Sequence, residues 1–155
     1  MAKRKSMKGD SCPVARSLDV VGDRWSLLIV RDAFDGTRRF SDFQRRLGVA
    51  RNILADRLRG LVEEDILMIQ PASDGTSYLE YVLTAKGERL FPVIVALRQW
   101  GERHLFGRGE QHSQLLDKAS GKPVRSMEPL GASGRTLKSG QTLVKKISDA
   151  GHLAH

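Results

Sequence analysis

The chain has 155 residues, enough for one modest domain and an appendage. Its single Cys excludes an internal disulfide framework, and no apolar run approaches the ~18 residues that a membrane-spanning helix needs. A formal net charge of +8 and a pI of about 10.1 favour an anionic partner such as a nucleic acid.

The N-terminal segment, residues 1–10, reads MAKRKSMKGD and is basic and poor in apolar residues. We expect a flexible tail here. No apolar stretch follows the basic residues, so the segment lacks the pattern of a secretory signal peptide. Together with the single Cys, this pattern leads us to expect a cytoplasmic protein without membrane association.

Two helices are expected after this tail. Ser11 is a good N-cap and Pro13 suits the first helical turn, and Val14 and Leu18 follow at helical spacing. A second helix is expected at about residues 24–33, with its large apolar side chains facing inward.

The segment 38–61 predicts the first half of a DNA-binding motif. Phe40 and Phe43 share one face of a short helix. Ser41 and Gln44 have the spacing of a capping box, which would satisfy backbone N–H groups at the start of this helix.

The second half of the motif follows a turn at Gly48. A helix over about 51–64 would bury Leu54, Leu58 and Leu61 on one face. Two short helices joined by a Gly-containing turn predict a helix-turn-helix.

Residues 67–84 change from a helical to an alternating period. Two β-like runs flank the sequence SDGT, and its Asp74-Gly75 pair is typical of a hairpin turn. A hairpin directly after a helix-turn-helix is a wing. The expected fold class is therefore mainly α (α+β), a winged helix-turn-helix.

A long final helix is expected from Thr84, its N-cap, to Phe106, with Pro92 bending or offsetting its start. Its apolar residues recur in alternating steps of four and three, as in a helix–helix seam. We expect one side to pack on its own domain and another to form a homodimer. The residues expected at this dimer interface are Val14, Leu18, Leu90, Ile94, Leu97, Trp100 and His104.

The composition changes after residue 106. Residues 107–155 hold seven of the fifteen Gly and none of the aromatic residues, so they cannot form a core alone. We expect a small β-rich appendage with short strands around Ser-Gly turns at 115–124 and 128–137, and disorder is the alternative. The expected organisation is a tail at 1–10, a winged domain at 11–106 and an appendage at 107–155.

The positive charge is concentrated in the expected helix-turn-helix, because residues 38–60 carry seven Arg against two Asp. The second helix of such a motif enters the major groove of DNA. On its outward face Asn52 could pair with adenine, and Arg51 or Arg59 with guanine. Ala55 could meet a thymine methyl group, and Asp56 could accept from cytosine or orient Arg59.

The other basic residues of this segment carry no sequence code. We interpret them as phosphate contacts that set register and affinity, or as surface ion pairs. These residues are Arg38, Arg39, Arg45, Arg46 and Arg57. Ser41 completes the set of residues expected to contact DNA.

The segment from Cys12 to Leu105 resembles the HxlR-type winged helix-turn-helix transcriptional regulators, relatives of the MarR group. The resemblance rests on five pieces that occur in the family's order and spacing: CPVARSLDVVGDRWSLLIVRD, RRFSDFQRRL, GVARNILADRLRGLVEEDIL, YLEYVLTAKG and WGERHL. It implies a homodimer with two recognition helices that binds a pseudo-palindromic operator on double-stranded DNA. It also implies repression or activation of adjacent genes, with a small-molecule or electrophile effector as a further expectation.

The chain departs from the family pattern at several positions. Ala50 stands where Ser often caps the recognition helix, and Asp65 stands where Gly commonly follows it. The expected wing tip has no basic residue. We therefore expect the wing to contribute less to DNA binding than in other family members, and the Arg-rich helices to contribute more.

Cys12 has two interpretations. The family includes sensors of oxidants and electrophiles with a Cys near this position, and the positive end of a helix dipole, with Arg16 one turn on, favours a thiolate. The alternative is a small, partly buried apolar residue at the subunit interface.

An enzyme is not expected. None of the four His, at positions 104, 112, 152 and 155, pairs with Cys or carboxylates at metal-ligand spacing, and there is no Gly-rich phosphate loop. We expect no catalytic residues, metal or cofactor. The competing functions are a winged-helix protein-interaction module and an RNA-binding module, although RNA readers stack bases on exposed aromatics that this chain places at core positions.

Overall fold

The computed structural model describes residues 5–147, which divide into two compact units with the boundary between Ile94 and Val95. The elements of the first unit are α1 (Pro13–Val21), α2 (Arg24–Phe34), α3 (Phe40–Leu47), α4 (Arg51–Glu63), β1 (Leu67–Pro71), β2 (Leu79–Leu83) and α5 (Ala85–Glu88). Helix α6 (Phe91–His104) begins in the first unit and continues into the second, where a short 3₁₀ helix follows at Ser139–Gln141.

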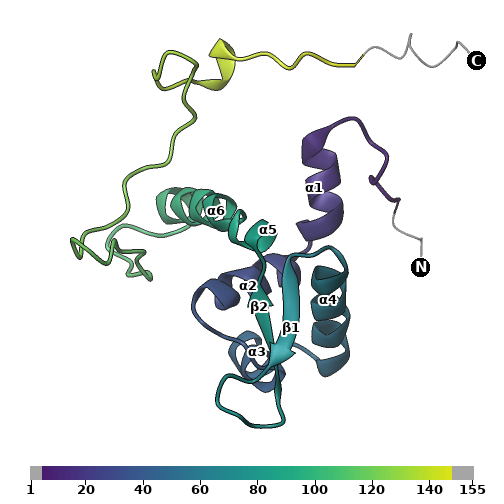
Figure 1. Cartoon of the computed structure of the whole chain (residues 1–155). Helices are drawn as coiled ribbons and strands as arrows, with labels where there is room; N and C mark the ends of the chain where they lie inside the picture. Colours follow the sequence, from purple (N-terminus) through teal and green to yellow (C-terminus); the bar gives the residue numbers. More distant parts are fainter. Residues whose placement is uncertain (1–4, 148–155) are drawn as a thin grey trace, which may run out of the picture. The chain divides into compact units, whose positions relative to one another are not determined.

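The core of the first unit lies between α2, α3, α4 and the hairpin. Ile29 of α2, Phe43 of α3, and Leu54 and Leu58 of α4 are fully buried. Figure 1 shows β1 alongside α4 and α2 behind the hairpin. This arrangement confirms the mainly helical winged helix-turn-helix, and it confirms which face of α4 is buried.

Local backbone chemistry sets the ends of these helices. The Asp23 carboxylate caps α2 by accepting from the backbone N–H of Ser26 at 3.0 Å. Gly48 ends α3 at a φ of 63°, a left-handed conformation that Gly adopts without strain. After α4, Asp65 adopts the left-handed conformation at a φ of 58°, one residue beyond the C-cap Glu64.

Two predicted caps are wrong. Helix α1 begins at Pro13 with Cys12 as its N-cap, so Ser11 lies one residue too early. Helix α3 begins at Phe40, because the N–H groups of Asp42 and Phe43 both bond to the carbonyl of Arg39. Ser41 is therefore already inside the helix and cannot cap it. The absence of a side-chain cap at Ala50 is as expected.

The predicted wing is confirmed. β1 and β2 pair antiparallel with Leu67 opposite Leu83 and Pro71 opposite Leu79. Gly75 turns the tip at a φ of 77°. The hairpin is also attached to the helix-turn-helix, because the Tyr81 N–H donates to the Arg38 carbonyl at 2.7 Å.

The long helix predicted from Thr84 to Phe106 is two helices. Thr84 caps α5 as expected, accepting from the Gly87 N–H at 3.0 Å. α5 ends at Glu88, and α6 starts again at Phe91. Pro92 lies in the first turn of α6 and has no N–H to bond back to the preceding turn, which explains the break.

The described part of the appendage, residues 107–147, contains two closed loops and no paired strands. Each loop predicted as a hairpin has a single bridge, Leu116 to Pro123 in one and Leu130 to Thr136 in the other. Gly121 and Gly134 supply the left-handed turns. The two bridges lie within the segments 115–124 and 128–137 that were expected to form short strands.

No helix in the described part of the chain is long and apolar enough to cross a bilayer. Between residues 5 and 147 there is also no group of three or more His, Cys, Asp and Glu that could hold a metal ion.

Candidate nucleic-acid interface

Helix α4 presents a polar face opposite the core. Leu54, Leu58 and Leu61 point inward, and their burial leaves Asn52 and Arg59 on the exposed surface. The structure therefore confirms the predicted inner and outer faces of this helix, although it does not test which outer residues contact DNA. An exposed polar helix after a tight turn is the geometry that enters a major groove.

Asp56 organises the middle of this face. Its carboxylate accepts from Arg59 at 2.7 Å and from Arg57 at 2.6 Å. The Arg59 pair spans one helical turn and lies in solvent, where such pairs contribute only about 0.3–0.5 kcal/mol. Arg59 can therefore leave Asp56 at little cost.

Arg51 occupies the leading end of α4. Its guanidinium lies 4.9 Å from the ring centre of Phe40, the first residue of α3. No carboxylate of the described residues lies within ion-pair distance of it. The stacking holds the charge at the helix-turn-helix junction without neutralising it.

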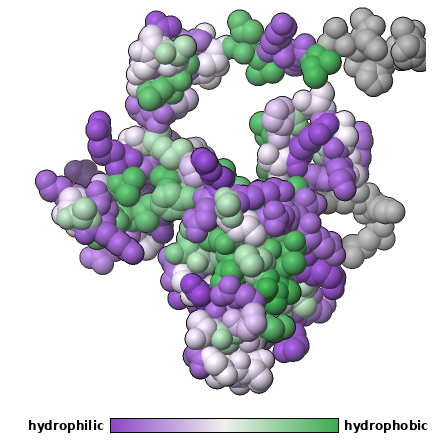
Figure 2. Space-filling view, viewed as in Figure 1, coloured by the Kyte–Doolittle hydropathy of each residue, from purple (hydrophilic) through white to green (hydrophobic). Residues whose placement is uncertain are grey.

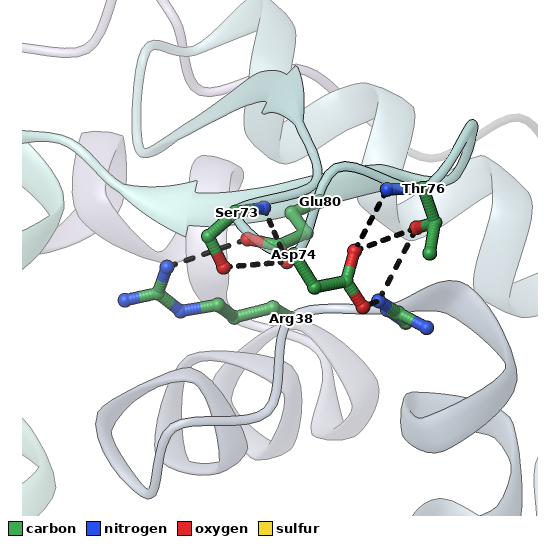
Figure 3. A network of polar contacts seen from close by, with 6 residues as sticks. Arg38, Ser73, Asp74, Thr76 and Glu80 are labelled. Carbon is green, nitrogen blue, oxygen red and sulfur yellow. Dashed lines mark hydrogen bonds and ion pairs between the residues drawn. The ribbon is translucent and has the colours of Figure 1, made fainter.

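Arg38 and Arg39 are bound to the wing (Figure 3). Arg38 donates to Glu80 of β2 at 3.3 Å, and Arg39 pairs with Asp74 at the wing tip. Arg39 also stacks on Tyr78, with 4.8 Å between its guanidinium carbon and the ring centre. Phosphate contacts and surface ion pairs were both open interpretations of Arg38 and Arg39, and the structure contains the ion pairs.

Figure 3 shows how the wing acids are held in place. The Glu80 carboxylate is nearly buried and also accepts from the N–H and hydroxyl of Ser73 at 3.2 and 3.3 Å. Asp74 accepts from the N–H and hydroxyl of Thr76 at 3.0 and 2.7 Å. The tip is therefore fixed by hydrogen bonds and by two arginines from outside the hairpin.

Acid should weaken the wing tip. The Thr76 hydroxyl, the Thr76 N–H and the Arg39 guanidinium lower the pKa of Asp74 to about 2, from an ordinary value of 3.8. Because the folded pKa is lowered, the stabilisation is complete above about pH 4 and disappears as the pH falls through about 2. The Tm difference between the wild type and Asp74→Asn should shrink over this range, and a constant difference would contradict the wing contact.

Arg46 and Arg57 connect helices to each other. Arg46 reaches Asp35 at 3.3 Å and lies 3.7 Å from the fully buried Asp32. Arg57 donates to Asp23, the N-cap of α2, at 3.0 Å. Burial raises the pKa of the Asp23 carboxyl, but hydrogen bonds from Ser26 and Arg57 outweigh it, so that the pKa lies below its ordinary value. Both arginines have a structural partner within the domain.

Arg45 is different from the other arginines of α3. It pairs only with Asp42, one turn away on the same helix, at 2.8 Å, and its side chain is 76% exposed. Ser41 is also exposed on this helix. Among the seven arginines of residues 38–60, those whose contacts in the described structure are only local or stacking contacts are Arg45, Arg51 and Arg59.

Comparison with known proteins identifies this architecture. Residues 20–108 match the family described as HxlR-like helix-turn-helix. The chain belongs to this family. The uncharacterized HTH-type transcriptional regulator Rv3095 of Mycobacterium tuberculosis is 48% identical over 92 residues, which are 59% of this chain. The match spans only 58% of the length of that relative.

Two solved structures of similar proteins extend beyond the HxlR-like region. The crystal structure of PA1607, described as a candidate transcription factor, is 50% identical and superposes with a TM-score of 0.87 over 92% of this chain and 100% of its own. PA1374 from Pseudomonas aeruginosa, described in the same way, is 45% identical with a TM-score of 0.61, over 90% of this chain and 97% of its own.

The predicted dimer residues of this HxlR-like chain fall into two groups. Val14 and Leu18 of α1 are 65% and 52% exposed, and Leu97 and Trp100 of α6 are 51% and 59% exposed. His104 stacks against Trp100 with 5.3 Å between ring centres. The second group, Leu90 and Ile94, packs against the core of its own unit.

Cys12 is exposed at the N-terminus of α1. Its backbone N–H donates to the Asp10 carboxylate at 2.8 Å, and the Arg16 guanidinium donates to the Asp10 carbonyl. The positive charge expected to favour a thiolate is therefore directed at Asp10, and a carboxylate lies next to the Cys backbone. Redox sensing at Cys12 stays a prediction.

Two buried acidic residues that hold arginines of the candidate interface in place were not predicted from the sequence. Asp32 is fully buried in α2 and has Arg31 as its nearest cation, at 2.9 Å. Glu80 interrupts the apolar run of β2. In the sequence, both acids stand among apolar residues of a helix or strand. This pattern could have predicted a cationic partner for each, because a buried carboxylate needs one.

Proposed function

We propose that this chain is a sequence-specific DNA-binding transcriptional regulator that acts as a homodimer in the cytoplasm. The observation that carries the proposal is the exposed polar face of α4, which follows a tight turn and lies beside exposed basic residues of α3. Membership of the HxlR-like family supports it. No catalytic chemistry is part of the proposal.

The arginines fall into groups according to where their ion-pair partners lie. Arg51 and Arg59, with Asn52, Ala55 and Asp56, form the base-reading set on α4, because all five are exposed on that helix. Arg45 grips phosphate from α3 with Ser41 beside it. Arg38, Arg39, Arg46 and Arg57 act mainly as braces, since each has a carboxylate partner on another element.

The wing then has a supporting role. Its acids, Asp74 and Glu80, would repel phosphate if they were free, and Arg39 and Arg38 neutralise them. In this proposal the wing orients the start of α3 and contributes little direct affinity. The operator is contacted mainly by α3 and α4.

The homodimer is supported by apolar side chains that the single chain leaves uncovered. Val14, Leu18, Leu97 and Trp100 are each more than half exposed. Val14 and Leu18 lie about one turn apart on α1, and Leu97 and Trp100 lie about one turn apart on α6, so each pair forms an exposed apolar patch of the kind that supports association. Two copies would present two α4 helices to half-sites about one helical turn, ~34 Å, apart or a multiple of it.

Gel-shift titration on the DNA upstream of the gene tests the division between α4 and the wing. Arg51→Ala should weaken specific binding by about tenfold or more, because it removes a charge that no carboxylate holds. The double variant Ser73→Ala, Ser77→Ala should have a smaller effect. Equal losses from both would contradict the minor role of the wing.

The same titration separates the alternatives. Specific DNA binding should survive excess competitor DNA and fall steeply with salt. A protein-interaction module or an RNA reader would lose the shifted band to competitor DNA.

A further inference from the structure

The first half of the C-terminal appendage is held by its own helix. The Gln99 amide of α6 donates to the carbonyl of Arg125 at 2.9 Å and accepts from the N–H of Met127 at 2.7 Å. Arg98 donates to the carbonyl of Ser113 at 3.0 Å. These bonds fold residues 113–127 back on α6.

Residues 128–147 have no such hydrogen bonds to α6, although they contain large apolar residues. Leu143 is 87% exposed, Val144 81% and Ile147 77%. Figure 2 shows hydrophobic and hydrophilic surface alternating along the last coloured part of the chain. Burying a Leu, Val or Ile side chain is favourable by about 1.5–3 kcal/mol, and these three exposed side chains do not gain most of this free energy.

This segment is nevertheless built as a defined structure. The loop around Gly134 is closed by two hydrogen bonds, from Gly131 N–H to Arg135 at 2.8 Å and from Leu137 N–H to Pro129 at 2.9 Å. A second turn follows at Ser139–Gln141. A segment with specific turns and exposed aliphatic side chains can bury those side chains only against another surface, since it has no core of its own.

The solved relatives support a structured segment. The HxlR-like region ends at residue 108, whereas the PA1607 crystal structure superposes on 92% of the chain. The superposition must therefore include much of the appendage. An appendage that adopts the same path in a crystallised relative is a structural part of the protein.

We propose that residues 129–147 form an arm that packs on a second copy of this chain. The arm carries Arg135, Lys138, Lys145 and Lys146 and no acidic residue. At the end of α4, Glu63, Glu64 and Asp65 follow one another and have no ion pair with any of the described residues, whereas Asp74, Glu80 and Glu102 are each paired with an arginine. The charge is complementary to that region of another copy. The aliphatic residues between the lysines favour a protein surface over a phosphate backbone. The inference rests on the proposed homodimer and specifies what strengthens it.

Sedimentation equilibrium of the full chain and two variants tests the arm. Leu143→Ser, Val144→Ser, Ile147→Ser should raise the dimer Kd at least about tenfold, since burial of one aliphatic side chain corresponds to roughly that factor. The matched control Lys145→Gln, Lys146→Gln keeps the aliphatic residues and should change the Kd by less. Neither variant touches the core, so both should keep the wild-type Tm at protein concentrations below the dimer Kd, where the monomer unfolds.

An unchanged dimer Kd in the triple variant would overturn the arm and leave the homodimer intact. A full chain that sediments as a monomer would instead overturn the homodimer. If only the lysine variant lost affinity, and only for DNA, the arm would be a DNA contact and the proposal would be wrong. Full-length protein is used in every case.

Discussion

Arg59→Ala should lower affinity for the operator by on the order of 1–3 kcal/mol, about 5- to 150-fold, and relax base choice at one position per half-site. Arg59 is exposed on the middle of α4, and within residues 5–147 its one ion pair is with Asp56, at 2.7 Å on the same helix. That pair is weak enough for a guanine to replace Asp56 as the partner. Binding to all single-base variants of the operator measures the relaxed position.

The matched control is Arg45→Ala on α3. Arg45 is equally free of long-range partners, with Asp42 as its ion-pair partner one turn away. As a phosphate contact it should weaken all sequences alike and reduce the slope of log affinity against log salt by about one. If both variants weakened all sequences equally, the assignment of Arg59 to base reading would be wrong.

Gly87→Ala should destabilise the first unit by about 1–3 kcal/mol or more. A Cβ at Gly87 would lie 2.1 Å from the carbonyl oxygen of Ile66 and 3.1 Å from a methyl carbon of Leu83. The closest atom belongs to the backbone, at the start of the wing, so the clash cannot be relieved by a side-chain rotation. α5 or β1 must shift. Urea denaturation measures the loss.

Gly60→Ala is the control for this substitution. Gly60 lies inside α4, and no heavy atom lies within 4 Å of the position of an added Cβ. Ala is favoured over Gly in a helix interior by up to about 1 kcal/mol, so this variant should be neutral or more stable than the wild type. A destabilised Gly60→Ala with an unaffected Gly87→Ala would contradict the packing of α5 against Ile66 and β2.

The sequence predicted the elements whose periodicity is strong. Leu54, Leu58 and Leu61 fixed the orientation of α4, because three leucines at helical spacing leave only one face for the core. The Asp74-Gly75 pair predicted the wing turn for an equally local reason. The exposed face of α4 could therefore be predicted without knowledge of tertiary contacts.

The partners of the arginines could not be predicted in this way. Arg39 and Asp74 are 35 residues apart, and Arg57 and Asp23 are 34 apart. Ion pairs over such separations depend on how helices and hairpin pack, and no local pattern encodes them. The charge count of residues 38–60 therefore overstated the charge available to DNA.

Two other differences have physical causes that compete with local propensity. The carbonyl of Arg39 already bonds the first N–H groups of α3, so Ser41 was too late to cap it. Pro92 lies in the first turn of α6, so the helix starts again at Phe91, and this offset start is one of the two effects expected of Pro92. The break between α5 and α6 was not predicted, because the apolar spacing continues through it.

Methylation interference on the upstream DNA tests most directly whether the exposed face of α4 reads the major groove. Guanine N7 lies in that groove, so methylation there blocks a helix that reads it. We expect interference in two patches whose centres are about 10 bp apart or a multiple of that spacing. Specific binding that no guanine N7 methylation disturbs, in a site containing G·C pairs, would contradict the account.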